Sequence, residues 1–221
     1  MGYDNWTDKQ KALAKKRLAE IDKNKENYKE KLKKRIENVE KNGLVDKNFA
    51  AGCKSCQGIP NEPDCLIGPY KDIEKGCNGD AHHVRPDGMG RLVSKKDEKA
   101  IGSKARLSGA GSHDDGIAIC IHPIAHKKTH SFIAIGWRGV RGKDGMADPD
   151  KAVAETEDAL RKQGGQKKKG DKKTSPSKAC IEKAIEESII ADQKRGFYKN
   201  KKVRATTGKL PDSTLKSFGI P

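Results

Sequence analysis

All six histidines of this 221-residue chain lie between His82 and His130. His82 and His83 are adjacent, whereas His126 and His130 are four residues apart. Neutral imidazoles bind divalent cations, and imidazole can also take a proton from water near neutral pH. Adjacent histidines at a strand end or turn can direct one ring at a metal and the other at a water, and histidines four apart on a helix share a face. This spacing predicts a metal site that activates water, as the hydrolysis of nucleic acids requires.

The composition indicates a polyanionic partner. The net charge is +16 and the pI is about 9.5, which favours nucleic acid, although a solvated lysine-rich surface or an acidic protein partner would also account for it. The hydrophobic fraction of 33% is low, so we expect the core to lie between about residues 44 and 150. No apolar run is long enough to cross a bilayer and residues 1–6 are not a secretory signal, so we expect no membrane partner.

The segments around the later histidines should form a strand followed by a helix. Residues 116–121 are apolar and rich in β-branched side chains, which predicts a strand. Pro123 then suits the first turn of a helix that carries His126 and His130. Whether residues 132–137 continue this helix or begin a strand is left open by the pattern.

Charged and irregular segments flank this centre. Caps, periodicity and composition predict helices over residues 8–41, 149–163 and about 175–196, a basic loop over 88–115, a disordered lysine-rich linker over 166–174 and a basic irregular tail over 197–221. The basic loop would contact a phosphate backbone or would be a solvated insertion. The expected divisions are a charged N-terminal helix or connector (1–43), a core that begins with a cysteine-rich segment (44–148), C-terminal helices with the linker (149–196) and the tail (197–221).

Four cysteines lie ahead of the first histidines. Cys53 and Cys56 form a CxxC pair, and Cys65 and Cys77 would complete four ligands for a structural zinc ion. Disulfides or free thiols are the alternatives, and spacing does not separate them. The surrounding segment is rich in Gly, Pro and Asn, so a covalent or metal cross-link would help it to fold. We assign these cysteines no catalytic role.

These motifs resemble a known family. His82-His83 followed by Pro86 resembles the HHxxP stretch of HNH-type endonucleases, including the nuclease colicins, and His126 with His130 resembles the paired histidines of their closing helix. The chain is more similar to the Tox-GHH group of bacterial polymorphic toxins. The matching segments are Pro69-Tyr70, Cys77-Asn78-Gly79-Asp80-Ala81-His82-His83-Val84-Arg85-Pro86-Asp87, Cys120, His126-Lys127-Lys128-Thr129-His130 and Ala179-Cys180-Ile181-Glu182. Scattered motifs carry this resemblance over about residues 50–190.

Two positions depart from the family pattern. Ala81 stands where the family has a glycine, and the asparagine that usually precedes the closing helix is absent. The residue that orients the base is therefore not given by the resemblance, and His122 and Asp114 are the candidates. His113 lies in a glycine-rich stretch, and we expect it not to be a ligand.

The resemblance implies an α+β fold with a small ββα-metal (His-Me finger) nuclease core. It implies that His83 is the general base and that His82, His126 and His130 hold one divalent ion, which could be magnesium, zinc, nickel or manganese. Contacts to phosphate are expected from Arg85, Arg91, Lys127 and Lys128.

The resemblance also implies a biological role. The chain would be a DNase toxin that a type VI or related system secretes, with an upstream delivery module, action in the target-cell cytoplasm and an immunity protein, which we expect to be acidic. RNA remains open as a substrate. The alternative is a non-catalytic nucleic-acid-binding module stabilised by zinc. A zinc-dependent deaminase is disfavoured because the chain contains no His-x-Glu.

Overall fold

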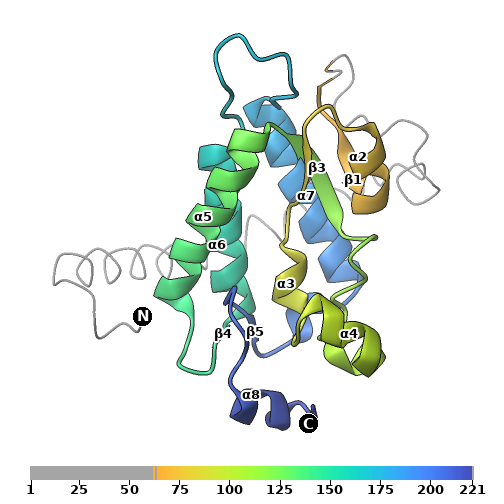
Figure 1. Ribbon diagram of the computed structural model, residues 1–221, viewed down its shortest axis with the longest axis vertical. Coiled ribbons are helices and arrows are strands. Elements are labelled where there is room, and N and C mark those ends of the chain that lie inside the picture. The colour runs from red at the N-terminus through yellow and green to blue at the C-terminus, as the bar shows by residue number, and fades with distance from the viewer. Residues whose placement is uncertain (1–61, 63, 221) are drawn as a thin grey trace, which may run out of the picture. The chain divides into compact units, whose positions relative to one another are not determined.

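The computed structural model describes residue 62 and residues 64–220 (Figure 1). The expected helix over 8–41, Cys53 and Cys56 lie outside the described residues. The described chain has an α+β fold with seven α-helices and two small antiparallel sheets. In chain order the elements are β1 (Ile67–Pro69), α2 (Tyr70–Gly76), β2 (Asp80–His83), α3 (Asp87–Gly90), α4 (Lys95–Ile101), the 3-10 helix η3 (Gly102–Ala105), β3 (Ile117–Ile121), α5 (Pro123–Val140), β4 (Met146–Ala147), α6 (Pro149–Gln163), α7 (Lys178–Lys194), the 3-10 helix η4 (Phe197–Lys199), β5 (Val203–Arg204) and α8 (Asp212–Ser217).

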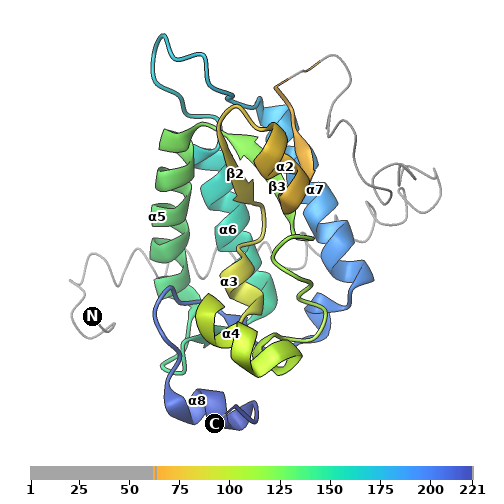
Figure 2. The same cartoon turned by 45° about the vertical axis from the view of Figure 1, so that its right-hand side comes forward.

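The larger sheet has the strand order β1-β3-β2, with β3 antiparallel to both neighbours (Figure 2). Alternate residues of β3 point to opposite faces. Ala118 and Cys120 pack with Ile73 of α2 on one face. On the other face β3 contacts α7, which the Cys65–Cys180 disulfide also ties to the segment before β1. The central strand is therefore covered on both faces, which explains its almost continuous apolar sequence.

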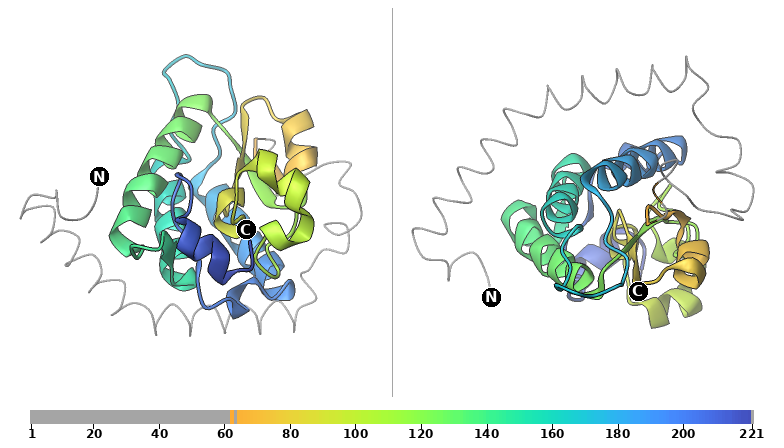
Figure 3. Two further views of the ribbon diagram at one scale, coloured as in Figure 1. Left: turned by 60° about the horizontal axis from the view of Figure 1, so that its bottom comes forward. Right: turned by 90° about the horizontal axis from the view of Figure 1, so that it is seen from above.

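Helices α5, α6 and α7 follow one another around the molecule, and α2 lies on the far side of the sheet (Figure 3). Helix α5 continues through residues 132–137, because Ile133 and Trp137 become buried against the rest of the core. The indole nitrogen of Trp137 donates to the carbonyl oxygen of Ala152 in α6. A Cβ at Gly136 would lie 2.2 Å from a carboxylate oxygen of Glu155, so a side chain there would force the two helices apart.

The predicted start of α6 is confirmed, whereas α7 begins at Lys178 rather than near residue 175 as expected. The Asp148 carboxylate accepts the backbone N–H groups of Asp150 and Lys151 at the start of α6, and Gly164 ends that helix. The Ser177 hydroxyl accepts the backbone N–H of Cys180 at the start of α7, and Gly196 follows its end with a φ of 75°. These bonds satisfy backbone groups that a helix end leaves unpaired.

The main hydrophobic core extends far beyond the expected limit of residue 150. The segments 88–115 and 197–221, expected as a basic loop and an irregular tail, form α3, α4 and η3, and η4, β5 and α8, respectively. Both segments bury apolar side chains in the same core as α5 and α6, and the described residues belong to one compact unit. The buried members include Met89, Leu92, Leu107, Ile133, Trp137, Val153, Phe197, Val203, Leu210, Leu215 and Ile220.

Candidate metal centre

Strand β2 divides the histidine pair between its two faces. Side chains alternate along a strand, so Asp80 and His82 lie on one face and His83 lies on the other. Pairing with β3 fixes this register along the whole of β2. A Cβ at Gly79 would lie 2.4 Å from the carbonyl oxygen of Ile121, so the strand pair needs a glycine just before β2.

Helix α5 brings two more imidazoles to the His82 face. His126 and His130 are one helical turn apart, and their Nε2 atoms lie 3.1 Å from each other. The His82 ring centroid lies 5.2 Å from that of His126 and 4.9 Å from that of His130. One ring nitrogen of each histidine lies within 4.8 Å of the others, so these three residues, the three-histidine cluster, could hold one metal ion.

The burial of His82 favours a ligand at this point. Its relative exposure is 1%, and neither ring nitrogen has a hydrogen-bond partner among the described residues. A buried polar group without a partner costs about 1–3 kcal/mol, which coordination to a metal would offset. Burial lowers the pKa of His82 well below its ordinary value, and nearby His130 and His126 lower it further. The ring is therefore neutral, which is the form that binds metals.

The surroundings of His126 and His130 also favour imidazoles with a free lone pair. Burial, followed by the proximity of His126, lowers the pKa of His130. The Nδ1 atom of His126 lies 3.0 Å from a carboxylate oxygen of Asp80. When Nδ1–H donates to that carboxylate, Nε2 keeps its lone pair and faces His130. An all-imidazole donor set of this kind suits zinc or nickel better than magnesium, which prefers oxygen ligands.

His83 belongs to a second cluster beside the first. Its ring stacks on Tyr70 with a centroid distance of 4.2 Å and an interplanar angle of 7°, and it meets the His113 ring edge-on at 4.7 Å. The Nε2 atom of His83 lies 2.9 Å from the carbonyl oxygen of His113, so Nε2 carries the proton and Nδ1 keeps a lone pair. Burial lowers the pKa of His83 to about 4, against the opposing effect of this hydrogen bond.

The His83 ring fits against backbone at Gly116. A Cβ at Gly116 would lie 2.8 Å from Cδ2 of His83, closer than carbon atoms approach without displacement. The carbonyl oxygen of Gly116 also accepts the backbone N–H of Tyr70, at 2.9 Å. The stacking Tyr70 and Gly116 are therefore hydrogen-bonded to each other, and both restrict the position of the His83 ring.

The orientation of His83 comes from a residue other than the two candidates. His122 caps α5 by accepting the N–H of Ile124, and its other ring nitrogen lies 3.0 Å from a carboxylate oxygen of Asp171. Asp114 contacts the ring of His113 rather than His83. The carbonyl oxygen that faces His83 belongs to His113, whose place in the site was not expected from the sequence.

Arg85 cannot contact phosphate as predicted. Its side chain is 7% exposed, and Nε donates to the Asp192 carboxylate of α7 at 2.6 Å. Its guanidinium lies 4.0 Å over the ring of Phe197 and also donates to the carbonyl oxygen of Ala110. This buried ion pair fastens the chain just after β2 to α7, so the role of Arg85 is structural.

Arg91 is also turned into the protein rather than toward solvent. It pairs with Asp87 at 3.4 Å and Glu98 at 3.9 Å, and Arg106 completes the same network. Its charge is compensated, so the predicted phosphate contact is not supported. Lys127 and Lys128 of α5 are exposed, and Lys128 Nζ donates to the side-chain oxygen of Gln166.

The disulfide alternative is confirmed for Cys65 and Cys77, and the zinc alternative that used these two cysteines is wrong. Cys65 is bonded to Cys180, and Cys77 is bonded to Cys120. Because the sulfur atoms of Cys65 and Cys77 are in disulfides, neither residue can bind a zinc ion together with Cys53. The Cys77–Cys120 bond ties the segment just before β2 to β3, next to the strand pair that carries His82.

Sequence reasoning missed the supporting residues Asp80, Tyr70 and His113. A signal for Asp80 was present, because residues two apart on a strand share a face and Asp80 stands two before His82. The sequence offered no comparable signal for His113, since its partner His83 is 30 residues away.

Comparisons of the chain with models of known protein families, with curated proteins and with solved structures find no match. Within the described part of the chain, none of the helices combines the length and apolar character needed to span a membrane.

Proposed function

We propose that this protein is a metal-dependent endonuclease of the HNH-like, ββα-metal type, and that its substrate is DNA. The three-histidine cluster is the observation that carries the proposal, because it places a buried imidazole without a hydrogen-bond partner beside two more imidazoles. The order β2, β3, α5 agrees with the resemblance to the Tox-GHH group, since the cluster joins the first and last of these elements. The net charge of +16 suits a phosphate backbone.

His82, His126 and His130 would hold the metal, and Asp80 would orient His126. A bound divalent ion supplies positive charge that stabilises the leaving oxygen and the transition state at phosphorus. The neutral state of His82 and His130 at pH 7 makes their lone pairs available without displacing a proton.

His83 would act as the general base through Nδ1. The carbonyl oxygen of His113 occupies its Nε2–H, which leaves Nδ1 to accept a proton from water. A pKa of about 4 keeps the ring neutral at pH 7, although it also makes the ring a weaker base than free imidazole. His83 contacts Tyr70 and His113 rather than the three-histidine cluster, and its side chain leaves β2 on the face opposite to His82, so its role as the base rests on the resemblance.

The toxin role rests on the resemblance. We propose a secreted antibacterial effector that travels with a delivery module and acts in the target-cell cytoplasm. An acidic immunity protein would block it most simply by covering the histidine site, because carboxylates complement a surface that binds phosphate. An inhibitor that binds without competing with DNA would contradict this part of the proposal.

Nicking of supercoiled plasmid DNA tests the function directly. The wild type should cut with added Mg²⁺, Mn²⁺, Ni²⁺ or Zn²⁺, and loss of a general base should slow cutting by about 10²–10⁴-fold. His83→Ala should therefore be nearly inactive yet still bind Zn²⁺, whereas His82→Ala should lose both properties. Lys99→Gln on the exposed face of α4, purified identically, controls for contaminating nucleases.

A non-catalytic binding module is the competing function. The disulfides remove Cys65 and Cys77 from its zinc site, so the three-histidine cluster would have to be its structural metal centre. Equal cutting by the wild type and His83→Ala would refute the assigned base. Absence of cutting by the wild type with all four metals, together with retained zinc binding, would favour the module.

A further inference from the structure

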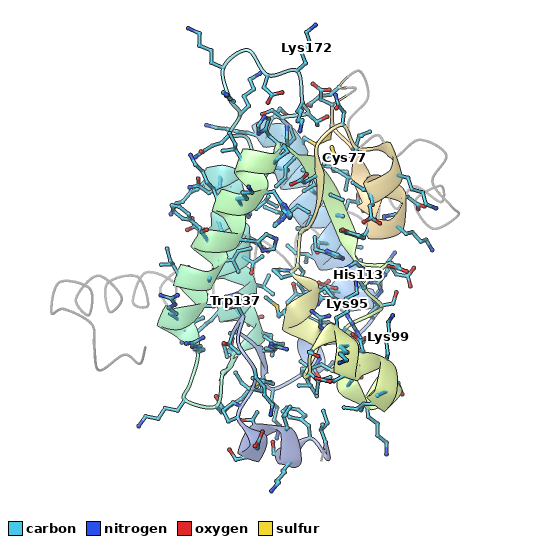
Figure 4. The ribbon with its side chains drawn as sticks, viewed as in Figure 1. Cys77, Lys95, Lys99, His113, Trp137 and Lys172 are labelled. Carbon is cyan, nitrogen blue, oxygen red and sulfur yellow. A yellow bond between two sulfur atoms is a disulfide. The ribbon has the colours of Figure 1, made fainter. Side chains whose placement is uncertain are left out.

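The loop between α6 and α7 carries the densest run of lysines in the described chain. Residues 166–174, the lysine loop, contain five exposed lysines, at positions 167, 168, 169, 172 and 173. The one acidic residue of the loop, Asp171, is directed at the buried ring of His122, with 3.0 Å between oxygen and nitrogen. Figure 4 shows Lys172 pointing away from the molecule.

The lysine loop is anchored, in contrast to the disordered linker expected from its composition. The backbone N–H of Thr174, which is buried, donates to the carbonyl oxygen of Asn78 at 2.8 Å. The side chain of Asn78 donates back to the carbonyl oxygen of Lys172 at 3.5 Å. The Asp171–His122 contact fixes the middle of the loop to the N-terminus of α5.

These anchors place the loop next to the three-histidine cluster. Asn78 stands two residues before Asp80, and His122 stands one helical turn before His126. Lys128, on the same helix as the ligands, contacts Gln166 at the start of the loop. In Figures 1 and 2 the loop projects beyond the N-terminal end of α5.

The chemistry of the loop fits a phosphate backbone better than an acidic protein. Ammonium groups on flexible stems follow phosphates without reading bases. Protein interfaces depend instead on aromatic, arginine or aliphatic anchors, and residues 166–174 contain none of these.

We infer that the lysine loop grips the nucleic-acid backbone that flanks the scissile phosphate, beside the three-histidine cluster. This inference rests on the proposed function, because it takes the substrate of that site to be nucleic acid. The loop holds the strand and takes no part in the chemical step.

Matched charge-removal variants test the inference. Lys167→Gln/Lys168→Gln/Lys169→Gln removes three loop charges, and Lys95→Gln/Lys96→Gln/Lys99→Gln removes three exposed charges from α4, which Figure 4 shows well away from the loop. Binding of a fluorescent 20-base-pair DNA duplex is measured in EDTA over a salt series, so that no cleavage is needed. The loop variant should bind about tenfold more weakly or worse, and its salt slope should fall by roughly 0.9 for each lost contact. The α4 variant should keep the wild-type slope.

Cleavage assays then separate the inference from the proposed function. With metal, the loop variant should lose kcat/KM on plasmid DNA but hydrolyse bis(p-nitrophenyl) phosphate at the wild-type rate. Unchanged duplex binding by the loop variant, equal weakening by both variants, or slower hydrolysis of the small substrate by the loop variant would each overturn the inference. If the wild type cuts neither substrate with any metal, the proposed function fails, while a binding loss confined to the loop variant still identifies the backbone grip.

Discussion

Replacing Asp80 tests whether the three-histidine cluster is a metal site with a supporting shell. Its carboxylate lies 3.0 Å from Nδ1 of His126, and no other contact is needed to fix which nitrogen of that ring carries the proton. In Asp80→Ala the imidazole can exchange tautomers and rotate, so part of the binding free energy is spent on restoring the productive form. The ligands themselves remain, so we expect metal affinity to be weakened rather than abolished.

The exposure of His126 and Asp80 indicates how much metal affinity Asp80→Ala should lose. Removing such outer partners of metal-bound histidines weakens metal binding by about 10–100-fold, or roughly 1.4–2.7 kcal/mol. The side chains of His126 and Asp80 are 28% and 39% exposed, so water can partly replace the lost hydrogen bond. We therefore expect a loss near the lower end, about tenfold, for Asp80→Ala. Asp80→Asn should lose less, because its amide oxygen can still accept from Nδ1–H.

Zinc titration against a chromophoric chelator measures this directly. Asp212→Asn is the matched control, because Asp212 is an exposed aspartate of α8 that pairs with Lys209. A wild-type affinity in Asp80→Ala would refute the reasoning, since the carboxylate would then have no influence on the ligand. Complete loss of binding would also contradict it, because Asp80 would then itself be a ligand.

Three further predictions concern the base and the framework. Gly116→Ala places a methyl group 2.8 Å from the His83 ring, so plasmid cutting should fall by about 10²-fold, whereas Gly88→Ala, where the new Cβ meets no atom within 4 Å, should cut normally. The metal-free protein should lose stability in acid because of His83. Above pH 6.5 the imidazole is neutral in both the folded and the unfolded protein, whereas between pH 6.5 and about 4 only the unfolded protein binds a proton there. The free energy of unfolding should therefore fall by up to about 3 kcal/mol. Urea unfolding at pH 7.5 and 4.5 should show a smaller loss in His83→Asn than in the wild type. Cys77→Ser/Cys120→Ser removes a disulfide whose cysteines are 43 residues apart in the sequence. The free energy of unfolding, measured in urea without thiol reagents, should fall by about 4 kcal/mol.

Each of these predictions can fail in a recognisable way. Normal cutting by Gly116→Ala would mean that the position of the base does not limit the reaction. Equal acid sensitivity of the wild type and His83→Asn would assign the loss to other groups, such as the buried His82. An unchanged free energy of unfolding in the double serine variant would show that the disulfide does not restrict the unfolded chain.

The local pattern of the sequence determined the parts of this protein that depend on near neighbours. The i and i+4 spacing of His126 and His130 placed both rings on one helix face, and Asp148 marked the start of α6, because helix periodicity and capping involve residues within one turn. The apolar run over 116–121 likewise predicted a strand, which the structure places at Ile117–Ile121 as β3.

Only the tertiary structure decided the features that join distant positions. Cys65 pairs with a cysteine 115 residues away, and Arg85 is buried against an aspartate 107 residues along the chain. His83 is separated from His82 because β2 is a strand whose pairing with β3 sends neighbouring side chains to opposite faces. Composition made the C-terminal segment look irregular, yet packing buries its sparse apolar residues. Local patterns carry the 2.0 and 3.6 periodicities, whereas the choice of partner across the core depends on how all the elements pack together.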